Sequence, residues 1–329
     1  MDEPTDPSVE RLSRSVEAGD YRDATACLGA FEAASAESRK AALRRLRETA
    51  GEQTAPLAPE LASFLTDGER SVRLTAAKLF VAAARADPSA VTDCVGALAD
   101  RVADEEEFYY VRARSAEALG YVALDHPDEV ATPALLADLR IGLSFDEPEV
   151  REKLAKALAA VAMGDPDRLS HHVPEFADHL DDGNELVRYQ LCTALAAIGC
   201  AAPTALVNAS SALAVRLDDE NEYVRARAAE ALGLLGQADA SETDAVAADV
   251  PVVDDPEPFV AARLAFARDA LAGEASAPDG VGTVDAVRET ASEVEDAVDA
   301  PDESNACPHC GLSLGDPGPP TCPGCGAPR

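Results

Sequence analysis

The sequence predicts an all-α protein in which helical hairpins stack into a solenoid. Of its 329 residues, 47% are hydrophobic, but only 4% are aromatic and none is Trp. The core must therefore be built from Ala, Leu and Val, which suit closely packed helices. In addition, one short phrase recurs along most of the chain at intervals of 34 to 39 residues. A constant period of this length is typical of repeat architectures.

The recurring phrase is an acidic turn, then Val-Arg, then an Ala/Leu-rich stretch. Counting two degenerate copies, the seven register positions are Ser38, Val72, Val111, Val150, Val187, Val224 and Val260. The residue five positions later is mostly small, as in Ala77 and Ala155, and three positions further on comes Leu or Phe. This spacing places the apolar residues on one face of a helix.

A second helical pattern precedes each phrase, so each repeat is predicted to be a helical hairpin. Examples are residues Leu57–Leu65, Val95–Val102, Leu135–Leu143 and Val173–Leu180. An aspartate lies in the turn between the paired helices, at Asp67, Asp146, Asp182, Asp219 and Asp255. Because the first turn of a helix has free N–H groups and a positive dipole end, we expect these carboxylates to cap the second helices.

The phrase is clearest from Asp219 to Gly233 and resembles HEAT repeats of the phycobilisome-lyase type. The resemblance covers about residues 21–275. It implies a HEAT-like right-handed α-solenoid of about seven hairpins, each unit packing only on its neighbours. It specifies function poorly, because such repeats serve scaffolds, adaptors, a few lyases and an iron hydroxylase.

The predicted organisation has four parts. Residues 1–20 form an N-terminal tail and first helix, 21–275 the solenoid, 276–305 an acidic linker, and 306–329 a separate C-terminal module. Within the linker, apolar residues from Val284 to Val298 lie near helical spacing. A short helix there either caps the last repeat or stays undocked, and the sequence favours neither.

The C-terminal module carries the one motif in the sequence that points to a specific chemistry. Two Cys-x-x-Cys pairs, Cys307/Cys310 and Cys322/Cys325, are separated by eleven residues. Four thiolates at this spacing suit tetrahedral zinc, and a full set leaves no open coordination position. The pairs resemble the knuckles of a zinc ribbon, which implies one structural zinc. One alternative is a redox-active Cys-x-x-Cys pair, but the sequence around the cysteines does not resemble a thioredoxin-like βαβ unit. The other is a pair of extracellular disulfides, but the sequence shows no signal-peptide pattern.

We interpret the formal charge of −33 as an adaptation to a saline habitat and not as a sign of the binding partner. Only four of the 28 cationic residues are lysines, and low Lys with abundant acid resembles the proteins of halophiles that keep molar salt in the cell. At such salt the Debye length is about 3 Å, so self-repulsion is weak. No stretch of 18 apolar residues and no signal-peptide pattern occurs, so we expect a cytoplasmic protein without membrane spans.

Three sets of residues are candidates for contacts. Arginines at one register (Arg73, Arg112, Arg151, Arg188 and Arg225) are interpreted as structural pairs with turn acids of neighbouring repeats. A second basic set, Arg114, Lys153, Arg227 and Arg263, lies two residues later on an inner side expected to be more exposed, where an acidic peptide or a phosphate backbone would dock. A solvated face balanced by Glu117 and Glu230 is the alternative. Phe108 and Tyr109 lie beside turn acids and form a candidate partner-binding spot.

The sequence favours a noncatalytic scaffold or adaptor that binds a protein partner on the concave solenoid surface, with the zinc ribbon as a second contact module. The alternative is nucleic-acid binding by the basic stripe and ribbon. A HEAT-like lyase or other enzyme comes third. None of the five histidines is followed by Glu, as the di-iron hydroxylases require, and no phosphate loop, nucleophile elbow or Rossmann fingerprint occurs.

Overall fold

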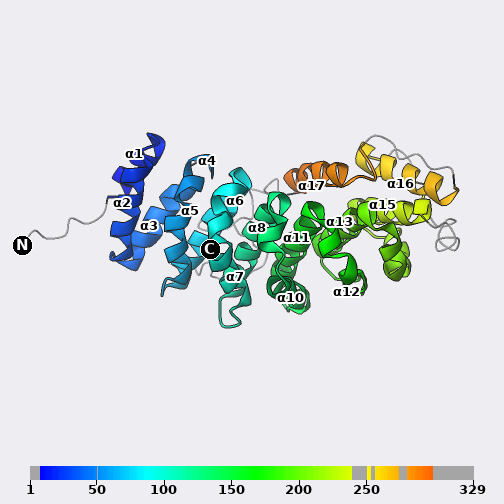
Figure 1. Cartoon of the computed structure of the whole chain (residues 1–329), viewed down its shortest axis with the longest axis horizontal. Coiled ribbons are helices and arrows are strands. Elements are labelled where there is room, and N and C mark those ends of the chain that lie inside the picture. Colours follow the sequence, from blue (N-terminus) through cyan, green and yellow to red (C-terminus); the bar gives the residue numbers. More distant parts are fainter. Residues whose placement is uncertain (1–7, 50, 239–249, 253–255, 274–279, 299–329) are drawn as a thin grey trace, which may run out of the picture. The chain divides into compact units, whose positions relative to one another are not determined.

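A computed structural model describes residues 8–49, 51–238, 250–252, 256–273 and 280–298 (Figure 1). Within these ranges every regular element is helical. The described chain forms two compact units, one made of residues up to Ser115 together with those from Ser292, the other of Ala116–Ala291. The all-α class predicted from the sequence is confirmed.

The first unit contains the N-terminal repeats. Its helices are α1 (Val9–Glu17), α2 (Tyr21–Glu32), α3 (Ala36–Arg47), α4 (Gly51–Thr54), α5 (Ala58–Leu61), α6 (Arg70–Ala86), α7 (Val95–Ala103) and the start of α8 (Tyr109–Asp125), with 3₁₀ turns η1 (Ala55–Leu57), η2 (Ala62–Thr66) and η3 (Pro88–Cys94). Helix α1 packs on α2 and α3, and α3 packs on α6. The predicted first helix is therefore part of the stack.

The second unit continues the series. It contains the end of α8, then α9 (Pro127–Val130), α10 (Pro133–Ile141), α11 (Pro148–Gly164), α12 (Val173–Asp178), α13 (Glu185–Ala201), α14 (Ser210–Arg216), α15 (Glu222–Ala238), α16 (Pro258–Leu271) and the start of α17 (Val284–Val298), with 3₁₀ turns η4 (Gly142–Ser144), η5 (Pro166–Arg168), η6 (Ser170–His172) and η7 (Pro203–Ala209). Helices α11, α13, α15 and α16 pack side by side in chain order (Figure 1).

The second helix of each repeat follows the predicted register. Helices α6, α8, α11, α13 and α15 are each 17 residues long. Like α3 and α16, they begin two residues before the register position. The Leu or Phe eight residues after that position is fully buried in the six repeats from Leu46 to Leu232. The small residue five positions after the register position is also buried in the five repeats from Ala77 to Ala229. The predicted apolar face of these helices is therefore the face that packs in the core.

Two glycines show how closely neighbouring helices approach. A Cβ atom added at Gly164 would lie 2.1 Å from the carbonyl oxygen of Ala123, and one added at Gly233 would lie 2.7 Å from the ring of Phe266. Both distances are below van der Waals contact. Glycine is therefore required at these positions by packing and not by backbone conformation.

Helix α7 covers the whole predicted stretch Val95–Val102, but other first helices are broken or shorter than their patterns suggest. The stretch predicted as a helix over Leu57–Leu65 divides into η1, α5 and η2. Pro56 and Pro59 occupy the first turns of η1 and α5 and lack the N–H that a continuous helical hydrogen-bond ladder needs. In the fourth repeat, the predicted stretch Leu135–Leu143 forms α10 followed by η4. In these two repeats the hairpin thus pairs one long helix with a broken partner.

Candidate functional site

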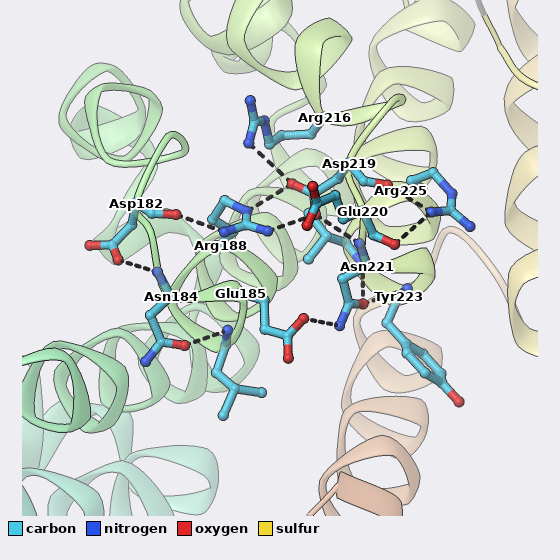
Figure 2. Close-up of polar contacts among 12 residues, drawn as sticks. Asp182, Asn184, Glu185, Arg188, Arg216, Asp219, Glu220, Asn221, Tyr223 and Arg225 are labelled. Atoms are coloured by element: carbon cyan, nitrogen blue, oxygen red, sulfur yellow. Dashed lines mark hydrogen bonds and ion pairs between the residues drawn. The ribbon is translucent and has the colours of Figure 1, made fainter. Parts of the chain in front are cut away.

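Three of the five register arginines, Arg73, Arg151 and Arg188, join one repeat to the next through the acidic turns, as predicted. Arg112 and Arg225 donate to backbone carbonyls of their own repeat. Figure 2 shows Arg188 of α13 between two turns. Its Nε and Nη2 atoms donate to the two carboxylate oxygens of Asp219 at 2.7 and 2.8 Å, and its Nη1 donates to the carbonyl oxygen of Asp182 at 2.7 Å. Arg151 binds Asp182 in the same two-pronged way, and Arg73 binds Glu107. These arginines are structural.

The turn aspartates do not cap the second helices, so that expectation was wrong where the structure describes it. In the turns before α13 and α15, Asp182 and Asp219 accept from the backbone N–H groups of Asn184 and Asn221, two residues on. The asparagines are the caps, since the Asn221 side chain accepts from the N–H of Tyr223 at 2.9 Å (Figure 2). The aspartates lie too early in the turn to cap, and their oxygens bind arginine instead.

Asp219 provides a test of these turn contacts. Although burial raises the pKa of its carboxyl, the hydrogen bonds from Arg188 and the backbone hold the pKa below its usual value. We expect Asp219→Ala to lower the free energy of unfolding by about 2–3 kcal/mol, because it removes hydrogen bonds between charged groups and leaves Arg188 unpaired. Denaturant titration at pH 7 measures the loss.

The control for this variant is Asp218→Ala, which deletes an exposed carboxylate one residue earlier and should change stability by less than about 0.5 kcal/mol. Because the pKa of Asp219 is lowered on folding, its contribution is present above the unfolded value of about 3.9 and disappears as the pH falls through the folded value. The two variants should therefore converge in stability below about pH 4. Equal losses at pH 7 would contradict this assignment.

The second basic set is not the exposed stripe that the sequence suggested. Arg227 is 0% exposed and Arg263 only 2%, so the expectation of exposure was wrong for both. Lys153 is half-buried and pairs with Glu152 at 2.9 Å and with Glu117 at 3.5 Å. Arg114, in the first unit, is half-buried. We call positions three and six residues after each register Val the inner row.

The buried arginines belong to a charged cluster between α15 and α16. Glu230 Oε2 accepts from Arg227 Nη1 at 2.7 Å and from Arg263 Nε at 2.9 Å, and Glu230 is itself fully buried. The Arg263 guanidinium lies 3.7 Å from the ring centroid of Phe259. Burial raises the pKa of Glu230, but the two guanidinium groups outweigh burial and hold the pKa below its usual value. Two cations therefore share one carboxylate.

Residues 280–291, which we call the docked segment, cover this cluster. Thr290 Oγ1 accepts from Arg227 Nη2 at 2.9 Å and from Arg263 Nη2 at 3.0 Å. The carbonyl oxygen of Val287 accepts from Arg227, and the N–H of Gly282 donates to Glu230 Oε1 at 3.0 Å. The sequence left open whether a helix at 284–298 docks. These contacts show that its first half does.

Phe108 and Tyr109 are both half-buried at the start of α8. Their ring centroids lie 4.6 Å apart, and the guanidinium of Arg70 lies 4.4 Å from the centroid of Phe108. The adjacent Glu107 is buried and bound by Arg73 and Arg101. Both aromatic rings thus contact residues of their own unit.

The predicted zinc ligands Cys307, Cys310, Cys322 and Cys325 lie outside the described residues. Among the residues described, no group of three or more His, Cys, Asp or Glu side chains is placed to hold a metal ion. Cys27, Cys94, Cys192 and Cys200 are free thiols. Burial raises the pKa of Cys192 and of Cys200 to about 12, which disfavours a reactive thiolate at either residue.

In the same described part of the chain, no helix combines the length and the apolar character needed to cross a bilayer.

Comparison with known proteins supports the repeat fold. A family profile of HEAT repeats matches residues 173–267. No curated protein matches the sequence significantly. Similar solved structures include an engineered protein with a TM-score of 0.66 and 19% identity, covering 89% of this chain and 79% of that one. A second engineered protein has a TM-score of 0.58 and 19% identity, covering 66% and 97%.

A designed armadillo repeat protein in complex with the peptide (KR)4 is also similar, with a TM-score of 0.54 and 18% identity, covering 69% of this chain and 99% of that one. At this level of identity the likeness concerns the fold alone. The chain therefore has the fold of an armadillo/HEAT-like repeat solenoid, and its residues 173–267 match the profile of HEAT repeats.

Proposed function

We propose that this chain is a noncatalytic scaffold that binds a protein partner through the inner face of its repeats. The observation that carries the proposal is the inner row. In the second unit, successive long helices place Lys153, Gln190, Arg227 and Arg263 at one register. Lys153 is half-buried, whereas Gln190, Arg227 and Arg263 are buried. A regularly spaced polar row on packed helices suits an extended partner where its side chains become uncovered, because each repeat then contributes one contact.

The similar designed armadillo protein is in complex with a basic peptide, (KR)4, which supports peptide binding by this kind of fold. Here the inner row carries lysines and arginines, so complementary charge selects an acidic segment instead. The proposed partner is therefore a protein with an acidic segment. A lyase or other enzymatic role has no support from a residue constellation in the described chain.

The C-terminal cysteines add a second contact module to the proposal. Cys307, Cys310, Cys322 and Cys325 would hold one structural zinc, since four thiolates complete a tetrahedral shell. A zinc module tethered to the repeats increases affinity for a shared partner through effective concentration. Zinc here supplies folding energy and takes part in no reaction.

Nucleic-acid binding is the less favoured function. Of the four basic residues that the sequence suggested for a phosphate backbone, Arg227 and Arg263 are buried and bound to Glu230. Lys153 is bound to two glutamates. With a net charge of −33, the chain would also repel a polyanion wherever salt does not screen it.

The acidic composition leads to a prediction about salt. We propose that the protein works in molar salt, and we expect far-UV helicity at 25 °C to fall when KCl is reduced from about 2 M to about 0.1 M, since the Debye length then grows to about 10 Å and carboxylates repel one another. Circular dichroism during dialysis measures this. A helical signal that stays constant over the range would contradict the habitat proposal.

Affinity capture with the full chain tests the scaffold. Purified protein is used as bait at 2 M KCl in an extract of its native cells, with and without nuclease, alongside Lys153→Glu. The control is Arg22→Glu, the same type of charge reversal at an exposed position on α2. We expect a specific protein that Lys153→Glu loses and Arg22→Glu keeps. Capture that depends on nucleic acid, or no specific protein, would contradict the proposal.

A further inference from the structure

We propose that the docked segment is a built-in competitor for the partner, and that Arg227 and Arg263 form the anion-recognition site which an acidic helix of the partner occupies in its place. This inference rests on the proposed scaffold function and specifies its surface and its partner chemistry. Three observations on the second unit carry it.

The first observation is the polar character of the interface beneath the segment. A helix that only closes a core covers apolar side chains, and here Val281 does pack on Leu234, Phe266 and Ala270. Directly alongside, however, the segment covers two guanidinium groups and one carboxylate that are almost fully buried. Buried charges contribute weakly to stability compared with apolar residues of similar volume. They are well suited to recognising a ligand.

The second observation is that the segment offers the two arginines only neutral acceptors, namely the carbonyl oxygens of Gly280 and Val287 and one hydroxyl, and that within the described residues one nitrogen of Arg227 is left without an acceptor. Thr290 offers a single hydroxyl oxygen to both Arg227 Nη2 and Arg263 Nη2. That hydroxyl also donates to the carbonyl oxygen of Ala286 at 2.6 Å. Arg227 Nε, which is buried, has no hydrogen-bond partner among the described residues. A carboxylate at the position of Thr290 would bring two acceptor oxygens and would neutralise the surplus positive charge of the cluster.

The third observation is charge complementarity along the chain. Residues 280–298 contain five carboxylates and one arginine. The described inner row of the second unit carries Lys153, Lys156, Arg227 and Arg263 against Glu117 and Glu230. The docked segment contacts the cluster through the Val287 carbonyl, the Thr290 hydroxyl and the Gly282 N–H, while its own Asp285 and Glu289 are exposed. A helix that turns a carboxylate toward the arginines would complement this face better, in the mode by which a helix binds a groove.

The segment is held in a way that permits release. The segment follows α16 after a few residues. Its outer contact is made by Arg288, which donates to the carbonyl oxygen of Leu124 at 3.0 Å and pairs with Asp125. The side chains of Arg288 and Asp125 are both about half exposed. A tethered competitor acts at high effective concentration, so a partner displaces it only if the partner's affinity for the site is high enough to overcome that concentration. The partner must therefore bind the arginines better than Thr290 does.

The test uses the full chain and labelled peptides. The probes are a peptide of residues 280–298 with the natural Thr290 and three variants of it, Thr290→Val, Thr290→Glu and Thr290→Gln, and binding is followed by fluorescence anisotropy in 2 M KCl. One protein is unaltered, and the other carries Val281→Asp and Val287→Asp, which replace the two larger of the four buried apolar side chains of the docked segment. Thermal melting checks that both are folded.

We expect the altered protein to bind the natural peptide at least tenfold more tightly than the unaltered protein does. The Thr290→Glu peptide should bind at least fivefold more tightly, and the Thr290→Val peptide at least fivefold more weakly, than the natural one. The Thr290→Gln peptide is the control, because Gln keeps the shape of Glu without the charge, and it should not reproduce the gain. Equal binding by both proteins, or no preference for the Thr290→Glu peptide, would overturn the proposal.

A dimer of the altered protein that binds no peptide would assign the face to a second copy of this chain and would also overturn it. If the altered protein does not fold, Thr290→Glu in the otherwise unchanged chain decides the question. Hydrogen exchange at the amides of residues 280–291 should slow at least fivefold, and Thr290→Gln should not slow it. Faster exchange in Thr290→Glu would overturn the proposal.

Failure of this proposal can be distinguished from failure of the scaffold function. If the unaltered and altered proteins capture the same specific partner from native extract in equal amounts, the scaffold function stands while the assignment of this face is wrong. If the peptides bind as expected but neither protein captures a partner, the anion-recognition site stands and the scaffold function loses its support.

Discussion

Replacing Glu230 by Gln should lower the free energy of unfolding of the second unit by about 3–5 kcal/mol, the range found when one partner of a buried ion pair is removed. Glu230 is fully buried and is the only carboxylate bonded to the guanidinium groups of Arg227 and Arg263 among the described contacts. The variant keeps the side-chain volume but leaves two buried cations uncompensated. Denaturant titration in 2 M KCl at pH 7 measures the effect.

Two further variants separate the charge effect from packing. Glu220→Gln makes the same chemical change at an exposed position just before α15 and should alter stability by less than about 0.5 kcal/mol. Replacing the cluster together, as Arg227→Met, Glu230→Leu and Arg263→Met, should recover most of the loss, because well-packed apolar residues can replace a buried ionic cluster. A loss below about 1 kcal/mol for Glu230→Gln would show that the cluster is not charged as described.

The same variant has a defined pH dependence. The pKa of Glu230 is lowered in the folded protein, so its contribution is present above the unfolded value of about 4.3 and is lost as the pH falls through the lower folded value. The stability difference between the unaltered protein and Glu230→Gln should stay constant from pH 7 to about pH 5 and shrink below that range.

Most of the repeat fold could be predicted from the sequence, because hydrophobic periodicity and spacing are local properties. Each long helix begins two residues before its register position, as at Glu185 and Glu222. The same pattern identified the pairing of Arg188 with a turn acid, since both positions recur with the period. Neither conclusion required knowledge of contacts between distant segments.

The inner row could not be predicted in the same way. Arg227 and Arg263 lie at the register of Lys153, and periodicity alone suggested equal exposure. Their burial depends on the docked segment, whose contact residue Thr290 is 63 and 27 positions away in the chain. The sequence offered one signal, the Arg-x-x-Glu spacing of Arg227 and Glu230, which places both side chains on one helix face.

The pairing of the turn aspartates with arginines was predicted, but the capping role assigned to them was wrong for a different reason. An acid shortly before a helix predicts an N-cap, and Asp182 and Asp219 meet that description. In both turns an asparagine closer to the helix, Asn184 or Asn221, provides the cap. Turn length decided the outcome, and that length is visible only once the first residue of the helix is known.

The largest effect is expected at the C-terminal cysteines. We predict that the unaltered protein binds one zinc ion per chain, and that replacing Cys307 and Cys325 by Ser abolishes stoichiometric binding, because two thiolates cannot complete a tetrahedral sulfur shell. Thiolate ligation of zinc has an apparent free energy on the order of 10–16 kcal/mol at neutral pH, and a segment of 24 residues is too small to fold without it. Metal analysis of the reduced, purified protein measures the stoichiometry.

The control is the pair Cys27→Ser and Cys200→Ser, which removes two thiols of the repeats and should leave one zinc ion in place. Since each repeat packs mainly on its neighbours, zinc loss should leave far-UV helicity and the main unfolding transition of Cys307→Ser/Cys325→Ser nearly unchanged. Absence of zinc from the unaltered protein would contradict the metal assignment. Melting of the repeats on zinc loss would instead show that residues 306–329 stabilise the solenoid, because their folding free energy would then be transmitted to the helices.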